Sequence, residues 1–311
     1  MSNIAQRDIF WNKVYDIARK DPDVIIISAD MGAAALDKFR RDIPAQFVNV
    51  GIAEQNAITL AAGLVLTGKK VFAYAIAPFI TLRCLEQIRV ENAIMQIPIT
   101  IVGVGVGFGY EDSGPTHHLI EDIAIMRAMP HIRIDSISDN VMAEYFAERS
   151  CSSDKKVTNY VRLDRLAAGT IYSPAMDFSK GLSLLKEGGD VCLIATGSMT
   201  HMAIEIADAL AQKNIKVGVL DLFNFPINEP EFLEKIRKFS KIVTMEEHLL
   251  AGGLGSAVLE VLNDHQAYIP VKRIGLPMDK GYCYKYGGRE AIRQYYGVDK
   301  ETILAEIAKL A

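Results

Sequence analysis

The chain has 311 residues, 50% of them hydrophobic, a formal net charge of -4 and a pI of about 5.9. This length suits two domains of ordinary size, and the apolar content is enough for a buried core in each. No long basic run is interleaved with aromatic residues, which argues against a nucleic-acid partner.

Helix and strand patterns alternate along the first half of the chain. A helix is expected over residues 4–20, and a β-branched run at 24–27 is typical of a strand buried on both faces. Further strands are expected at 46–50, 71–74, 99–104, 132–134 and 157–163, with helices at 53–66, 79–96, 121–129 and 139–149. This alternation predicts βαβ units and a parallel sheet.

The pattern breaks over a segment without clear periodicity and then restarts. A linker is expected at about 171–184. Strands are then expected at 191–195, 216–220, 242–245 and 271–274, with helices at 200–213, 231–239, 255–263 and 289–311. The sequence therefore predicts an α/β fold of two tandem doubly wound domains, 1–170 and 185–311, each with a mostly parallel central sheet flanked by helices.

Cysteine usage and the N-terminus indicate the compartment. The four cysteines lie far apart and form no Cys-x-x-Cys pattern, so free thiols in a reducing compartment are expected. The N-terminal residues lack the basic start and apolar core of a signal peptide. The uncharged stretch 92–110 contains a proline and four glycines, which favours a buried strand and a glycine-rich loop over a membrane helix. We expect a cytoplasmic protein without a membrane partner.

One carboxylate, Glu54, lies where the strand expected at 46–50 turns into a helix of small residues. A carboxylate in apolar surroundings has a raised pKa and can hold or hand over a proton near neutral pH. The alternative is an ordinary acidic residue in the first turn of a helix, where the helix dipole favours negative charge.

Two adjacent histidines, His117 and His118, follow the glycine-rich loop 103–109. They are expected to be solvent-accessible and able to exchange protons at cellular pH, so acid/base or substrate contact and plain loop histidines both stay open. Adjacent histidines point in different directions, and no metal ligand is predicted. Arg162 and Arg165 flank Asp164 at a strand end, where an arginine can clamp a phosphate or carboxylate, or form a surface ion pair with Asp164.

Glycine-rich turns at 197–200 and 252–256 each follow a strand and precede a helix. Both can bind an anion at a helix N-terminus, although such turns are usually structural.

Taken together, ordered segments over nearly the whole chain resemble the C-terminal portion of transketolase. In the family's order and spacing they are Ser28-Ala29-Asp30, residues 48–56, residues 79–89, Gly114-Pro115-Thr116-His117 and residues 193–198. The resemblance implies a pyrimidine-binding domain, a transketolase C-terminal domain and thiamine diphosphate as cofactor. It implies a transferase that moves a two-carbon ketol unit from a ketose or ketose phosphate to an aldose.

The resemblance also implies residue roles. Glu54 would hydrogen-bond to N1′ of the cofactor's aminopyrimidine and share a proton with it, and His117 would be the second catalytic residue. The implied cofactor-binding residues are Asp30, Ile52, Glu54, Tyr74, Phe79 and Arg83. The implied substrate-binding residues are Arg7, Asp112, Ser113, His117, His118 and Arg165.

The chain departs from the family in a way that predicts a partner. It has no Gly-Asp-Gly followed further on by Asn, the segment that holds Mg²⁺ and the diphosphate in this family. The chain is thus expected to be half of a split transketolase. An N-terminal transketolase subunit would carry the metal and diphosphate, the cofactor would lie across the interface, and two copies of each chain would form an α2β2 heterotetramer.

The substrate side departs as well. An insertion leaves open whether Asp112 or Ser113 takes the substrate-hydroxyl role, and His118 replaces a family glutamine. Ile76 stands at the first aromatic position of the pyrimidine pocket, which Tyr74 can compensate. These departures predict a modified or differently anchored sugar.

Other assignments stay open on sequence alone. The β subunit of a 2-oxo acid dehydrogenase E1 shares the layout and the cofactor, and 1-deoxyxylulose-5-phosphate synthase is a further relative. A non-catalytic binding or scaffolding subunit is the alternative of a different class.

Overall fold

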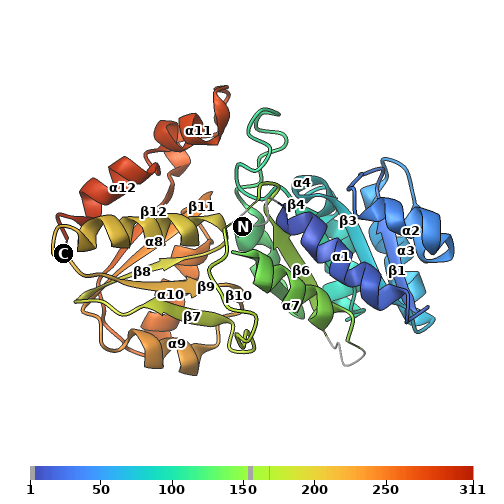
Figure 1. The fold of residues 1–311 in the computed structure, drawn as a ribbon, viewed down its shortest axis with the longest axis horizontal. Helices are drawn as coiled ribbons and strands as arrows, with labels where there is room; N and C mark the ends of the chain where they lie inside the picture. The colour runs from blue at the N-terminus through green and yellow to red at the C-terminus, as the bar shows by residue number, and fades with distance from the viewer. Residues whose placement is uncertain (1–3, 153–156, 168, 311) are drawn as a thin grey trace.

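Short apolar runs form the central strands of two sheets that lie in separate α/β units (Figure 1). The computed structural model describes residues 4–152, 157–167 and 169–310. The first sheet has seven strands, all parallel to their neighbours except the last. In spatial order they are β2 (Phe47–Asn49), β1 (Val24–Ser28), β3 (Lys70–Ile76), β4 (Thr100–Val104), β6 (Thr158–Leu163), β5 (Ile132–Ser136) and β10 (Asn224–Phe225).

The second sheet has five strands, with one antiparallel edge formed by β7 on β9. In spatial order they are β12 (Val271–Leu276), β11 (Lys241–Leu249), β8 (Val191–Ala195), β9 (Gly218–Leu222) and β7 (Leu182–Lys186). The two sheets with their flanking helices confirm the predicted α/β class.

Helices cover the sheets in both units. In the first unit they are α1 (Gln6–Ala18), α2 (Leu36–Asp42), α3 (Glu54–Leu66), α4 (Ala77–Ile80), α5 (Leu85–Gln87), the π-helix Ile88–Ile94, α6 (Asp122–Arg127) and α7 (Asn140–Ser150). In the second they are α8 (Ser198–Ala211), α9 (Glu229–Ile236), α10 (Leu254–Asp264), α11 (Gly288–Tyr296) and α12 (Lys300–Ile307). Short 3-10 turns lie at Pro44–Gln46 and Met278–Lys280.

An aromatic cluster on α1 anchors the first sheet. Trp11 is fully buried, and its ring makes edge contacts with Phe10, Phe72 and Tyr74 at centroid distances of 5.3, 5.9 and 5.1 Å. Aromatic burial of this extent is among the larger contributions to core stability. The cluster packs α1 against the sheet, so the first turn of α1 lies beside the carboxyl end of β3.

Some elements differ from the sequence expectation. The helix expected at 79–96 divides into α4, α5 and a π-helix: α4 ends at Ile80, and Cys84, whose ψ of 12° lies outside the helical region, precedes α5. The C-terminal helix divides at Gly297, whose left-handed backbone ends α11, and Asp299 caps α12 through Thr302. The short elements α2, β7 and β10 carry too little periodic signal to be predicted.

The chain after β9 returns to the first sheet. β10 pairs antiparallel with β5, and Asn224 Nδ2 donates to Asp135 Oδ1 at 2.7 Å. The preceding Phe223 is buried against Phe146 and Phe178, with centroids 6.1 and 5.7 Å away. The proposed boundary at 185 separates most of the sheet content of the two units, but β7 begins at Leu182, inside the segment expected to be a linker.

Within the described ranges, no helix is both long enough and apolar enough to span a bilayer.

The buried position of Phe223 leads to a stability prediction. Phe223→Ala should lower the free energy of unfolding by about 3–5 kcal/mol, because it removes a large ring from a filled core shared by the two units. Tyr268, which is 85% exposed, offers the control: Tyr268→Ala should change stability by less than about 0.5 kcal/mol. Urea titrations would measure both, and equal effects would contradict the assigned packing.

Candidate active site

The residues expected to act on ligands gather at one edge of the seven-stranded sheet. Asp30 follows β1, Glu54 follows β2, Phe79 follows β3, His117 lies in the loop after β4, and Arg165 follows β6. Carboxyl ends of neighbouring parallel strands meet at the same edge, where α/β proteins bind their ligands. Residues from five separate parts of the chain are thus brought to one place by the sheet.

Glu54 is the first residue of α3 and is 3% exposed. Its Oε2 accepts a hydrogen bond of 2.6 Å from Nη1 of Arg83. Glu54 therefore lies at a helix N-terminus, as the plain alternative required, and it is also a buried carboxylate with a cationic partner. The Arg83 guanidinium in turn lies over the Phe79 ring, 4.3 Å from its centroid.

An aromatic row continues from Phe79 toward Arg165. The Phe79 ring meets the His117 ring edge to face at 5.1 Å, and His117 lies 6.1 Å from the ring of Tyr110. The Arg165 guanidinium lies over Tyr110 at 5.0 Å. We call Phe79, His117 and Tyr110 the aromatic row. It connects the carboxylate at one end with a cation at the other, and His117 lies between them with its Nδ1 3.1 Å from Thr116 Oγ1.

Tyr110 is the member of this row that sequence reasoning missed. It is the first aromatic residue after the glycine run, and that placement is the signal that could have found it. Burial raises the pKa of its hydroxyl, and the charges of Arg165 and Arg7 oppose that rise. Two cations thus lie near one phenol.

Arg7 lies in the first turn of α1, close to Tyr74 and Tyr110. Its Nε and Nη2 donate to the two carboxylate oxygens of Asp8 at 3.1 Å each. Tyr74 is fully buried on β3, and its hydroxyl has no hydrogen-bond partner among the described residues. Burial raises the pKa of Tyr74, an effect that the nearby Arg7 charge partly offsets.

The other predicted residues lie at the exposed rim of this edge. Asp30 has a left-handed backbone with φ of 51° and exchanges hydrogen bonds with the Asn49 side chain. Ile52 is 79% exposed, an unusual position for a large apolar side chain next to a buried carboxylate. Asp112 and Ser113 are exposed in the loop after β4.

The expectation that both histidines are solvent-accessible is wrong for His118. It is 4% exposed, its ring makes an edge contact with Phe108 at 5.4 Å, and Nε2 is buried without a partner among the described residues. Burial lowers the pKa of its imidazole. Adjacent residues in this turn point to opposite sides, so His117 faces the aromatic row while His118 packs under the loop.

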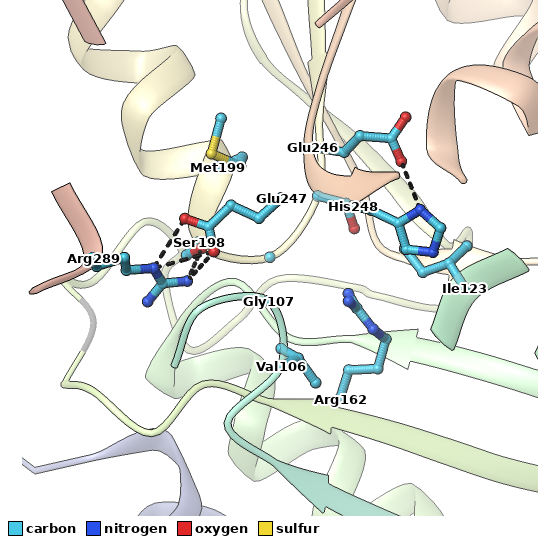
Figure 2. Close-up of a pocket in the computed structure, with 12 residues that line it drawn as sticks. Val106, Gly107, Ile123, Arg162, Ser198, Met199, Glu246, Glu247, His248 and Arg289 are labelled. Carbon is cyan, nitrogen blue, oxygen red and sulfur yellow. Dashed lines mark hydrogen bonds and ion pairs between the residues drawn. The ribbon is translucent and has the colours of Figure 1, made fainter. Parts of the chain in front are cut away.

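The glycine-rich turn at 252–256 is occupied by the protein itself. Glu246 on β11 accepts hydrogen bonds from the backbone N–H groups of Leu254 and Gly255 at 2.6 and 2.9 Å, so its carboxylate caps α10. A Cβ on Gly253 would lie 2.1 Å from Glu246 Oε2. The role of this turn is therefore structural, and the Glu246 carboxylate occupies the position that a phosphate would take. Figure 2 shows Glu246 and its neighbour His248 in the lining of a pocket to which both units contribute residues.

No group of three or more histidine, cysteine or acidic side chains that could hold a metal ion occurs among the residues that the structure describes.

Comparison with known proteins identifies the family. Residues 2–169 match the family described as transketolase, pyrimidine binding domain, and residues 181–303 match transketolase, C-terminal domain. The chain is 35% identical over 307 residues to a subunit of the apulose-4-phosphate transketolase of Phocaeicola vulgatus, covering 96% of this chain and 95% of the relative. It is 33% identical over 273 residues to a 6-deoxy-6-sulfo-D-fructose transketolase subunit of a Clostridium species, covering 87% and 84% of the two chains.

A solved structure gives the same result. The chain matches a split-gene transketolase, described as an inactive β4 tetramer, with a TM-score of 0.85 and 30% identity over 99% of this chain and 98% of that one. The fold and the matched domains therefore define the class: a chain made of the pyrimidine-binding domain and the C-terminal domain of transketolase-type enzymes. The chain belongs to the transketolase family, as the C-terminal subunit of a split enzyme.

The buried Glu246 predicts a pH dependence of stability. Burial raises its pKa to about 7 from an unfolded value near 4.5, and the backbone donors at Gly255 and Leu254 only partly oppose this. The folded state therefore keeps the proton between these pH values, and stability falls as pH rises through the window. Glu246→Gln should not show that loss. The free energy of unfolding of the variant minus that of the natural chain should rise by about 2–3 kcal/mol between pH 4.5 and 8.

Denaturant titrations across this pH range would measure the difference. Leu259, 40% exposed on α10, supplies the control, because Leu259→Ala removes no titratable group and its difference should not follow pH. A difference for Glu246→Gln that is constant or falls with pH would contradict the assignment.

Proposed function

We propose that this chain supplies the pyrimidine side of a thiamine diphosphate site in a two-chain transketolase. The enzyme would transfer a two-carbon ketol unit from a ketose with an anionic end group to an aldose. The observation that supports this most is the continuous set of contacts from Glu54 through Arg83 and the aromatic row to Arg165. These contacts bring a buried carboxylate and a guanidinium to one edge of the sheet, which supports a proton-holding role for the first and an anion-binding role for the second.

The residues at the Glu54 end suit an aminopyrimidine. The ring of Phe79 and the exposed side chain of Ile52 can cover an aromatic heterocycle, and the buried carboxylate can bind a ring nitrogen. Oε2 of Glu54 is bonded to Arg83, and the described part of the chain offers no bond to Oε1. When bound, thiamine diphosphate supplies the electron sink that allows a bond beside a ketose carbonyl to break.

In this arrangement Glu54 holds and shares a proton at the pyrimidine, and Arg83 keeps the carboxylate in place. Tyr74 lies buried near the Arg7 charge, and Asp30 lies at the rim where the cofactor would leave this chain. His117 lies in the middle of the aromatic row, where an imidazole can move a proton to or from a substrate hydroxyl. Asp112 or Ser113 would bind another hydroxyl from the exposed loop.

The other end of the row suits a tetrahedral anion. Arg165 and Arg7 both act on Tyr110 by their charges, and a guanidinium binds phosphate or sulfonate oxygens through paired N–H donors. Of the two relatives compared above, one is named for a phosphorylated sugar and the other for a sulfonated one. We propose that His118, buried under the loop, supports this face instead of contacting the substrate.

A partner chain completes the site in this proposal. An N-terminal transketolase subunit would bind Mg²⁺ and the diphosphate, and two copies of each chain would form an α2β2 heterotetramer. The exposed Ile52, beside a buried catalytic group, fits a surface that a partner covers. The four cysteines are buried and free, which supports the proposed cytoplasmic location.

Removing the Glu54 carboxylate should separate catalysis from assembly. Glu54→Gln in the reconstituted two-chain enzyme should lower kcat by about 10²–10⁴-fold, because the amide cannot share a proton with the pyrimidine. Assembly, measured by size-exclusion chromatography with light scattering, should be unchanged. Glu86→Gln, on the neighbouring α5, should keep full turnover. Unchanged turnover in Glu54→Gln would contradict the mechanism and favour a scaffolding role.

Donor preference tests the sugar. With the partner present, kcat/KM for the pair xylulose 5-phosphate and ribose 5-phosphate should be at least about tenfold lower than for a branched ketose phosphate such as apulose 4-phosphate, or for 6-deoxy-6-sulfofructose. The reason is the altered loop at Asp112 and Ser113, which presents different hydrogen-bonding groups to the substrate. Steady-state assays with each donor would measure this, and full activity with the ordinary pair would contradict the specialised substrate.

A further inference from the structure

A buried network of charged groups joins the two units behind the candidate active site (Figure 2). Its centre is Arg289, in the first turn of α11, which is 8% exposed. The guanidinium donates to the Glu247 carboxylate from Nε at 2.9 Å and from Nη2 at 2.6 Å. It also donates from Nη1 to Asp164 Oδ2 and from Nη2 to Ser198 Oγ, each at 2.7 Å. We call these residues, with Arg293, the Arg289 network.

One arm of the Arg289 network fixes the backbone around Arg165. Asp164 precedes Arg165, and its Oδ2 accepts the hydrogen bond from Arg289 Nη1. Its Oδ1 accepts a hydrogen bond from the backbone N–H of Leu166 at 3.1 Å. The chain therefore turns around Arg165. The Asp164 N–H donates to Gln6 Oε1 at 3.1 Å, and Gln6 precedes Arg7. Both proposed anion-binding arginines thus neighbour a residue of this arm.

The other arm fixes the loop that carries Tyr110. Glu247 Oε2 accepts from the Phe108 N–H at 3.2 Å, and the Arg289 N–H donates to Glu111 Oε2 at 2.7 Å. Gly107 has a φ of +58°, and a Cβ there would lie 2.5 Å from Glu247 Oε2, so only glycine allows this approach. Phe108 and Glu111 lie on either side of Tyr110, which therefore sits between two anchored points.

The composition of the network favours a geometric role over a purely stabilising one. Arg289 and Arg293 pair with two buried carboxylates, those of Glu247 and Asp164, and Arg293 also pairs with the exposed Glu290. Burying such groups costs desolvation energy, and apolar residues would hold two units together at least as well. What the charges add is direction, because a planar guanidinium fixes each carboxylate at a defined place.

We infer that Arg289 is a positioning residue of the active site. From the C-terminal unit it holds the turn around Arg165 and the loop around Tyr110, so it sets where the end group of the substrate is bound. The inference rests on the proposed function for the identity of the bound group, and on the hydrogen bonds alone for the positioning.

The test compares two arginine-to-lysine variants in the reconstituted two-chain enzyme. Arg289→Lys keeps the charge but cannot hold Glu247, Asp164 and Ser198 together. Arg149→Lys is the matched control, because Arg149 donates to the fully buried Asp135 at 2.6 Å and lies on α7, away from the aromatic row. A weaker variant, Ser198→Ala, removes one partner of Arg289 and preserves the rest if Arg289→Lys folds poorly.

The kinetic readout uses two donors. KM for a ketose phosphate or sulfonate should rise about tenfold in Arg289→Lys, and by a smaller factor in Ser198→Ala, because the anion-binding face is misplaced. KM for L-erythrulose, which offers a ketol unit without an anionic end group, should change by less than about threefold. Arg149→Lys should leave both unchanged. Equal losses for both donors, or no loss for either, would overturn the inference.

Hydrogen exchange gives a readout that needs no substrate. In Arg289→Lys the amides of residues 106–118 and 164–166 should exchange about tenfold faster than in the natural chain, while those of β1 and β3 should not. If the natural complex shows no transketolase turnover, the proposed function fails and exchange alone decides the inference. Unchanged exchange in residues 106–118 and 164–166 would overturn the positioning role.

Discussion

The parallel pairing of β1, β3, β4 and β6 is the constraint on which the site depends. β1, β4 and β6 are buried on every residue and β3 on all but its two end residues, and each strand ends at the same edge of the sheet. A parallel ladder requires a crossover between strands, so the residues that follow the strands come from distant parts of the chain. Phe79, His117 and Arg165 are neighbours because of this pairing, and Glu54 joins them through β2, which pairs parallel with β1. The chemistry of the site therefore depends on the burial of apolar strands that take no part in it.

Glu54 shows how context changes the meaning of one residue. A carboxylate at the start of a helix is favoured by the helix dipole whatever its function. The structure keeps that feature and adds two others, near-complete burial and the Arg83 guanidinium at 2.6 Å. The ion pair fixes where the carboxylate lies beside Phe79, so the placement of Glu54 depends on a partner 29 residues further along the chain.

Much of the fold could be predicted, because buried parallel strands read as continuous β-branched runs and helices as apolar repeats. Val24 to Ser28 is such a run, and its pairing with β3 follows from the alternation of elements. The meeting of the motif residues at the strand ends could also be predicted, since their order along the chain follows a known family, and their roles stay predictions. Prediction failed where the outcome depends on which side of a turn a residue faces, as for His118, or on a two-residue strand such as β10.

The Arg289 network could not be predicted for a different reason. Arg289 is separated from Asp164 by 125 positions and from Glu111 by 178, and no local pattern marks such pairs. A charged residue at the start of a helix is expected to be solvent-exposed, and only the packing of the other unit against it shows that Arg289 is buried.

This network also bears on why the second unit accompanies the first. The end of a strand fixes the start of a loop but not the positions of the side chains further along it. The loop after β4 is rich in glycine, so its backbone can adopt many conformations. Anchors at Phe108 and Glu111, supplied from β11 and α11, remove that freedom on both sides of Tyr110. The second unit can therefore contribute to binding without touching a ligand, since restricting the loop before binding reduces the ordering cost that binding would otherwise carry.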